Sequence, residues 1–193
     1  MVQVTPTRER LLRAAALLFR SQGYAATGVN QVLAEGGAPK GVLYFHFPGG
    51  KEQLAAEAVA LTGSQLREAI SGMLAAAPGP GAGIGQIAEM FGQALLASDF
   101  REGCPVATVA LDASAGSEAI RASCQGAYSS WADVLERHFR DHGVAGEEAG
   151  HLATFVLASF EGALLLARVQ RDLTPLQTVS ATLADIADKA VRT

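Results

Sequence analysis

Two short helix-forming segments, separated by a pair of glycines, constrain the fold of this chain more than any other feature. The first runs from about Gly28 to Glu35, and the second starts at Pro39 and is less than two turns long. Gly36-Gly37 ends the first segment, since glycine is favoured just beyond a helix C-terminus. A short helix, a tight glycine turn and another short helix predict a helix-turn-helix.

The rest of the chain is predicted to be helical as well. Hydrophobic residues make up 49% of it and charged residues 18%, with few aromatic side chains and no strand-like runs of β-branched residues. Helical spacing of apolar residues, interrupted by glycine and proline, predicts further helices over about 7–22, 51–76, 84–98, 105–115, 117–142, 146–171 and 175–191. We therefore expect an all-α fold of about nine helices: an N-terminal three-helix domain (1–50) and a six-helix C-terminal domain (51–193).

Charge is distributed unevenly along the chain. Residues 1–51 hold six Lys and Arg against two Glu, a net charge of +4, whereas the remainder holds nine cations against seventeen acids, a net charge of −8. A basic head on an acidic body indicates that only the head approaches a polyanion. Chance clustering is the alternative, because the head contains only eight charges.

The second helix of a helix-turn-helix enters the major groove, where base edges can be distinguished. Here it would present Pro39, Lys40, Gly41, Val42, Tyr44 and Phe45. Lys40 suits guanine, Val42 suits a thymine methyl, and Tyr44, His46 and Lys51 suit phosphate oxygens. Leu43 and Phe47 are expected in the core, and Phe45 either stacks on the DNA or rests on the surface.

The segment "GYAATGVNQVLAEGGAPKGVLYFHFPGGKEQL" resembles the DNA-binding segment of the tetracycline-repressor (TetR) family. The resemblance rests on a glycine-aromatic pair, a "KGxLYxxF" core and a Lys-Glu-x-Leu helix start. It implies DNA contacts by Lys40, Gly41, Tyr44, His46 and Lys51, by Thr27, and by Asn30 as a base contact of the preceding helix. Gly28 departs from the family pattern, which usually has Ser or Thr as the helix cap.

The double glycine of "FPGGKEQL" and the stretch "GCPVATVALD" (103–112) are similar to the LmrA/YxaF-like branch of that family. This resemblance implies a homodimer with an internal cavity for a small hydrophobic or planar ligand. It also implies a repressor that its ligand releases from a double-stranded DNA operator.

Small residues along one side of the segment 153–167 predict a face to which a partner helix can come close. The last helix supplies further apolar residues at helical spacing. Packing of both faces inside the monomer is the alternative. The predicted dimerisation residues are Ala158, Ser159, Gly162, Ala163, Ala167, Leu176, Val179, Leu183 and Ile186.

Larger side chains of the middle helices are candidates for the cavity, because small-molecule pockets are mostly apolar. Phe91 and Trp131 are the first choices, although any single candidate is also ordinary core material. The predicted ligand-binding residues are Met90, Phe91, Leu95, Phe100, Val106, Val109, Tyr128, Trp131 and Phe155.

Other chemistry is not indicated by the sequence. His138 and His142 have metal-capable spacing, but no clear third ligand accompanies them. No catalytic or cofactor motif occurs, and the apolar stretch 152–169 is interrupted by Glu161. We expect a cytoplasmic, non-membrane regulator without cofactor or metal. The alternative is a helical small-molecule carrier or enzyme whose head makes protein contacts.

Overall fold

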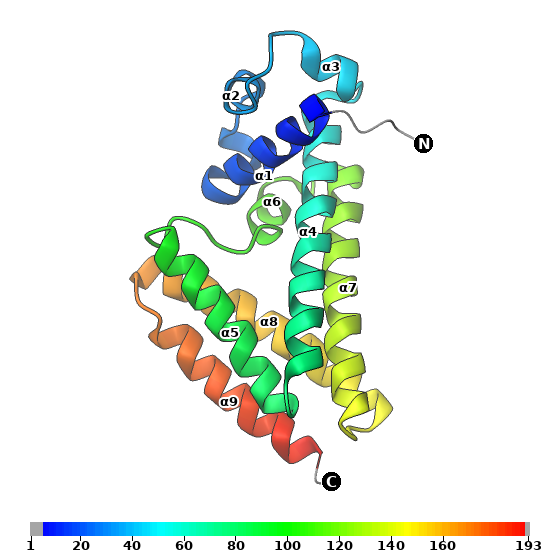
Figure 1. Cartoon of the computed structure of the whole chain (residues 1–193), viewed down its shortest axis with the longest axis vertical. Helices are drawn as coiled ribbons and strands as arrows, with labels where there is room; N and C mark the ends of the chain where they lie inside the picture. The colour runs from blue at the N-terminus through cyan, green and yellow to red at the C-terminus, as the bar shows by residue number, and fades with distance from the viewer. Residues whose placement is uncertain (1–5, 192–193) are drawn as a thin grey trace. The chain divides into compact units, whose positions relative to one another are not determined.

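The computed structural model describes residues 6–191, which form nine α-helices and no strand (Figure 1). The expected all-α fold is therefore confirmed. The helices are α1 (Pro6–Ala26), α2 (Val29–Glu35), α3 (Val42–His46), α4 (Gly50–Ala76), α5 (Pro80–Ala97), α6 (Ala107–Ala113), α7 (Glu118–Asp141), α8 (Gly146–Gln170) and α9 (Thr174–Ala190).

The chain divides into two compact units. Unit 1 contains the described residues up to Gln65 together with Cys104–Ala127, and unit 2 contains Leu66–Gly103 and the described residues from Tyr128 onward. The long helices α4 and α7 each begin in unit 1 and end in unit 2. The boundary predicted at residue 50 concerns function, and it stays a prediction.

Unit 1 combines the short helices of the head with α6. Its fully buried side chains include Leu11 and Phe19 of α1, Leu43 of α3 and Leu54 of α4, with Phe47 directly after α3. The expected core positions of Leu43 and Phe47 are thus confirmed. Helix α6 lies beside α1, so a segment distant in sequence completes the unit (Figure 1).

Gly23, which was expected to end the first helix, interrupts α1. Gly23 has φ 85° and ψ 169°, which breaks the helix locally, but helical structure resumes and extends to Ala26. The Thr27 hydroxyl donates a hydrogen bond to the Gly23 carbonyl at 2.7 Å and so satisfies an acceptor at the break. The glycine-aromatic pair therefore forms a kink inside α1.

In unit 2, helix α5 starts earlier than expected. Its first turns, from Pro80, use glycines that were interpreted as a linker. A Cβ on Gly81 would lie 2.5 Å from an oxygen of Asp188, and one on Gly83 would lie 2.6 Å from the Leu74 side chain. The Gly81 N–H also donates to Asp188 at 2.9 Å. These glycines therefore permit close packing of a helix.

Helix α8 is more apolar than we expected from its sequence. Among residues 6–191, α8 is the one helix that is long and apolar enough to cross a membrane. Its most apolar 18-residue window has a mean hydropathy of 1.7, and 39% of that window is buried. The expectation that the stretch 152–169 is not apolar enough for a membrane span because Glu161 interrupts it was wrong by length and composition, because alanine and leucine outweigh one carboxylate. Core helices of soluble proteins have the same composition, so this property alone does not indicate a membrane protein.

Candidate nucleic-acid interface

Helix α3 is held by two buried residues and presents the side chains between them to solvent. Leu43 and Phe47 are completely buried, whereas Tyr44 is 63% exposed and Phe45 is 80% exposed. Lys40 is exposed directly before the helix, and His46 is half-buried. The expectation that Lys40 and Tyr44 face outward is confirmed, and an exposed surface of one cation and two large rings results.

The turn that leads into α3 is longer than the sequence predicted, so the helix begins later. The helix starts at Val42 rather than at Pro39, so Pro39 and Lys40 lie in the preceding turn. Gly41 is the N-cap residue and has φ 93°, in the left-handed region that favours glycine. Gly41 therefore sets the direction in which the helix leaves the turn, and Lys40 extends from a loop.

Thr27 and Asn30, which lie before and on α2, differ in whether DNA could reach their side chains. Thr27 is 1% exposed, and besides donating to Gly23 its hydroxyl accepts a hydrogen bond from Gln22 at 3.1 Å. A DNA contact by the Thr27 side chain therefore does not fit its buried position. Asn30 is exposed on α2, and Gly28 caps this helix without a side-chain hydrogen bond.

Lys51 lies at the start of α4, where its ammonium is 4.2 Å from the centre of the Tyr24 ring. Burial lowers the pKa of Lys51, and the negative charge of Asp112 acts in the opposite direction. Burial, and then the charge of Glu52, raises the pKa of Tyr24. The ammonium is thus held on an aromatic face near the N–H groups of a helix N-terminus, where anions bind readily.

Hydrogen bonds from α4 hold the loop that follows α3. Gln53 accepts a hydrogen bond from the Gly49 N–H at 2.8 Å and donates to Glu57 at 2.9 Å. Glu57 in turn forms an ion pair with Arg8 of α1. This chain of contacts fixes the C-terminal end of α3 between α1 and α4.

A further contact holds α2 against α1. The Arg10 guanidinium donates to the carbonyl of Gly36 at 3.0 Å, where α2 ends. Cations are favoured at the negative end of a helix. Two basic residues of the head thus support the fold, the buried Arg8 and the exposed Arg10, and Arg13 and Lys40 are also exposed.

The predicted dimerisation residues fall into two groups within unit 2. Ala158, Gly162 and Ile186 are exposed, and Ser159 and Val179 are half-buried. The other four predicted residues are buried inside the protomer, so the exposed apolar face of α8 lies on a different side of that helix from its two buried alanines. The buried residues are Ala163, Ala167, Leu176 and Leu183. The exposed α8 face consists of Phe155, Ala158, Gly162, Leu165, Leu166 and Val169.

Phe91 and Trp131, the first choices for the ligand site, line a common cavity of about 20 Å³ in unit 2. Phe91 lies near Phe160, with ring centres 6.2 Å apart, and Tyr128 contacts Trp131 edge-on at 5.3 Å. Drug-sized ligands need pockets of about 300–1,000 Å³. The cavity lining is Ile70, Ile87, Phe91, Trp131, Leu135, Leu157, Phe160, Glu161 and Leu164.

The remaining candidate ligand residues are dispersed. Val106 and Val109 are buried in unit 1, Leu95 is buried in unit 2, and Phe155 is exposed. Met90 and Phe100 are half-buried. A larger groove of about 450 Å³ lies between α5 and α9 and was not anticipated. Its lining includes Gly85, Ala88, Glu89, Gly92, Leu96, Leu176, Gln177 and Ser180.

The two histidines with metal-capable spacing lie near the end of α7 (His138) and directly after it (His142). The His138 and His142 rings are 4.4 Å apart, but no group of three or more metal-capable side chains occurs among residues 6–191. Burial and then the nearby His142 lower the pKa of His138, which is 6% exposed. His138 is therefore a buried polar side chain of unit 2, with the half-buried His142 beside it.

Three residues that contact the head were not predicted from the sequence: Asp112, Gln53 and Glu57. Asp112 of α6 accepts a hydrogen bond from the Ala25 N–H at 3.3 Å. The available signals were an acid on a short apolar helix and two polar residues spaced four apart at the start of α4. Neither pattern identifies its distant partner.

Comparison with known proteins identifies the class that this architecture defines. Residues 11–58 match the bacterial regulatory proteins of the tetR family, and residues 80–182 match the C-terminal domain of LmrA/YxaF-like transcriptional regulators. The chain belongs to the TetR family of transcriptional regulators, in its LmrA/YxaF-like branch. Both resemblances found in the sequence are thus confirmed.

Among curated proteins, the chain is 40% identical to the HTH-type transcriptional regulator LmrA of Bacillus subtilis over 180 residues, which cover 93% of this chain and 96% of LmrA. It is 26% identical to the HTH-type transcriptional repressor DhaR of a Mycobacterium species over 181 residues, 89% of this chain and 87% of DhaR. A TetR regulatory protein of Rhodobacter sphaeroides has the same fold, with a TM-score of 0.84, 21% identity and coverage of 94% and 98%.

These relatives set the coarse function of the chain. It is a DNA-binding transcriptional regulator of the helix-turn-helix type. Its relatives are regulators rather than enzymes.

Proposed function

We propose that this chain is a homodimeric, cytoplasmic repressor without enzymatic activity, released from its operator by a small hydrophobic or planar ligand. The observation that carries the DNA-binding part is the exposed surface of Lys40, Tyr44 and Phe45, supported from below by Leu43 and Phe47. An exposed cation beside large exposed rings, on a helix with buried anchors, suits a major-groove contact.

The residues proposed to contact DNA reach different parts of the duplex. Lys40 donates to a guanine edge, and Val42 contacts a thymine methyl. Tyr44, His46 and Lys51 contact phosphates, with Asn30 reaching a base from α2. Thr27 is left out of this scheme because its side chain is buried.

The exposed α8 face supports dimerisation. Phe155, Leu165, Leu166 and Val169 are each more than half exposed and lie along one side of the helix. Contiguous apolar surface of this kind marks an interface, since burying it stabilises association by about 25 cal/mol per Å². We infer that a second copy covers this face, with α9 contributing Ile186. Two heads then read half-sites about 34–36 Å apart.

The cavity between Phe91 and Trp131 is the proposed ligand site. At about 20 Å³ it is too small for a drug-sized ligand, so a ligand has to separate the helices that line it. Helix α4 carries both Ile70, which lines the cavity, and Lys51. A displacement of α4 would therefore change DNA affinity, and a coupling of about 1–3 kcal/mol corresponds to a roughly 5- to 150-fold change.

The DNA-binding part is tested by gel retardation with the DNA upstream of the chain's own gene, competed with a shuffled fragment of equal length. We expect retardation that the shuffled fragment fails to compete at equal concentration. Equal competition by the two fragments at low salt would overturn the proposal.

The ligand part is tested with the single tryptophan. Trp131 is buried at the cavity, so a ligand that opens the cavity changes its fluorescence and raises the melting temperature. Phe91→Ala should alter ligand affinity, whereas Leu96→Glu, in the groove between α5 and α9, should not. The reverse pattern would move the ligand site to that groove.

A further inference from the structure

Helix α6 contacts the head through one carboxylate. Asp112 is the second-to-last residue of α6. Its carboxylate accepts a hydrogen bond from the backbone N–H of Ala25, near the end of α1. The two residues are 87 positions apart in the sequence, and both belong to unit 1. Asp112 thus joins the middle of the chain to the DNA-binding segment.

The fit of this carboxylate depends on the break in α1. A Cβ added to Gly23 would lie 2.5 Å from the Asp112 carboxylate oxygen, so that oxygen occupies the space left by the missing side chain. Because Gly23 has φ 85° and ψ 169°, the backbone turns there and the Ala25 N–H meets an acceptor from outside α1. Asp112 is therefore seated in a specific position.

The seated charge acts on Lys51. The Lys51 ammonium lies 4.2 Å from the centre of the ring of Tyr24, the residue between Gly23 and Ala25. The negative charge of Asp112 raises the pKa of Lys51 against the effect of burial, so the two opposite charges attract each other. Without DNA, the Lys51 ammonium therefore lies on an aromatic face and feels the negative charge of Asp112.

We propose that Asp112 competes with DNA phosphate for the Lys51 ammonium and so lowers the affinity of the head for DNA. This inference rests on the proposed role of Lys51 as a phosphate contact. A phosphate that binds Lys51 must approach the fixed negative charge of Asp112, which already attracts the ammonium. Asp112 is a positioning residue whose charge restrains binding to every sequence alike.

Asp112→Asn separates the charge from the hydrogen bond. The asparagine oxygen still accepts from Ala25, while the charge is lost. Exposed charge pairs of this kind correspond to about a two- to fivefold change in affinity. We expect Asp112→Asn to tighten binding to operator and to shuffled DNA by that factor, with a smaller effect at high salt.

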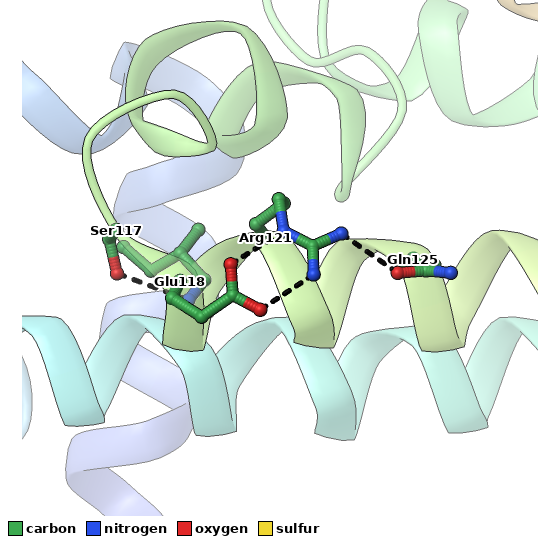
Figure 2. Close-up of polar contacts among 5 residues, drawn as sticks. Ser117, Glu118, Arg121 and Gln125 are labelled. Carbon is green, nitrogen blue, oxygen red and sulfur yellow. Dashed lines mark hydrogen bonds and ion pairs between the residues drawn. The ribbon is translucent and has the colours of Figure 1, made fainter.

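Glu118→Gln is the matched control for charge. Glu118 also belongs to unit 1, but its carboxylate is bound by Arg121 on the same helix at 2.6 and 2.7 Å, and Arg121 also donates to Gln125 (Figure 2). We expect little change in DNA affinity from this variant. Tightening equal to that of Asp112→Asn would show a general charge effect and overturn the inference.

A double-mutant cycle tests the route through Lys51. In a Lys51→Gln background, Asp112→Asn should no longer tighten binding. Persistence of the full effect there, or weaker or unchanged binding by Asp112→Asn alone, would overturn the inference. If Lys51→Gln leaves DNA binding unchanged, then the proposed phosphate contact fails, and the inference fails with it.

The coupling between the two residues can also be measured without DNA. Titration of the Lys51 side chain by NMR should give a lower pKa in Asp112→Asn than in the wild type, because an attractive negative charge has been removed. An unchanged pKa would overturn the inference even where the wild type binds its operator as proposed. The two measurements therefore distinguish failure of the inference from failure of the proposed function.

Discussion

Arg8 of α1 forms an ion pair with Glu57 of α4, and its guanidinium also lies 4.8 Å from the centre of the Phe47 ring. Phe47 directly follows α3, so this contact joins α1, α4 and the end of the exposed helix. The Arg8 side chain is 9% exposed and that of Glu57 is 32% exposed. The geometry of the DNA-binding surface thus depends on a partly buried ion pair.

Glu57→Gln should destabilise the protein, because it leaves the buried Arg8 charge without its carboxylate partner. We expect a loss of about 1–3 kcal/mol in the free energy of unfolding. Urea denaturation followed by circular dichroism measures it. Glu9→Gln, which removes an exposed partner of Arg13 at 3.7 Å, should cost less than about 0.5 kcal/mol. Equal effects of the two variants would contradict the structural role of Glu57.

Gly23→Ala should also destabilise the protein. Its φ of 85° strains any side chain, and the new Cβ would meet the Asp112 carboxylate. The expected loss is about 1–3 kcal/mol in unfolding free energy. Gly72→Ala is the control, since an added Cβ in α4 meets nothing within 4 Å and alanine favours a helix by about 0.5–1 kcal/mol. A neutral Gly23→Ala variant would show that α1 does not need this break.

Stability should fall as the pH drops below the ordinary pKa of histidine. Burial, and then the charge of His142, lowers the pKa of His138 from 6.5. The unfolded chain therefore binds a proton at a higher pH than the folded one. The stabilisation is complete above about pH 6.5 and is lost as the pH falls toward the lower folded-state pKa, by at most about 1.4 kcal/mol per pH unit.

Urea denaturation at pH 7.5, 6.5 and 5.5 measures this dependence. His138→Gln should flatten the profile over that range, whereas His151→Gln, at an exposed position on α8, serves as the control. An identical slope for the wild type and His138→Gln would assign the pH dependence to other groups.

Leu166→Glu should convert a dimer into a monomer. Leu166 is 51% exposed on the apolar face of α8, and a carboxylate there would be buried without a partner in the proposed interface. Analytical ultracentrifugation at micromolar concentration measures the oligomeric state. Leu96→Glu, at a leucine on α5 that is 54% exposed, should leave the dimer intact. A Leu166→Glu protein that stays dimeric would exclude the α8 face.

The sequence predicted the helices well where apolar spacing and strong breaks coincided. The end of α4 at Ala76 and the start of α8 at Gly146 agree with the expected bounds. The error fell on Gly81, which was placed outside the helices although α5 begins at Pro80, whereas Gly23 does interrupt α1. Both positions are fixed by carboxylates distant in the sequence, Asp112 and Asp188. A local pattern carries no information about such partners.

The candidate DNA surface could be predicted because it depends on local helical spacing. The alternation of buried Leu43 and Phe47 with exposed Tyr44 and Phe45 follows from helical spacing alone. The inward position of Thr27 does not, because it depends on the break at Gly23. On α8, small residues predicted a close contact without distinguishing a partner helix of the same protomer from one of a second copy.

Sequence readout by Lys40 beside Tyr44 is the central feature of the proposed function. Binding to operator and shuffled DNA, measured by fluorescence anisotropy over a salt series, tests it most directly. Lys40→Ala should lower the preference for operator about 5- to 150-fold, as expected for 1–3 kcal/mol of base discrimination. Lys51→Ala should weaken binding to both DNAs by the same factor and reduce the salt slope by about one phosphate contact. Lys189→Ala, which removes a cation of unit 2 paired with Asp185, should change neither value. Equal, sequence-independent losses from Lys40→Ala and Lys51→Ala, or no loss from Lys40→Ala, would contradict the account.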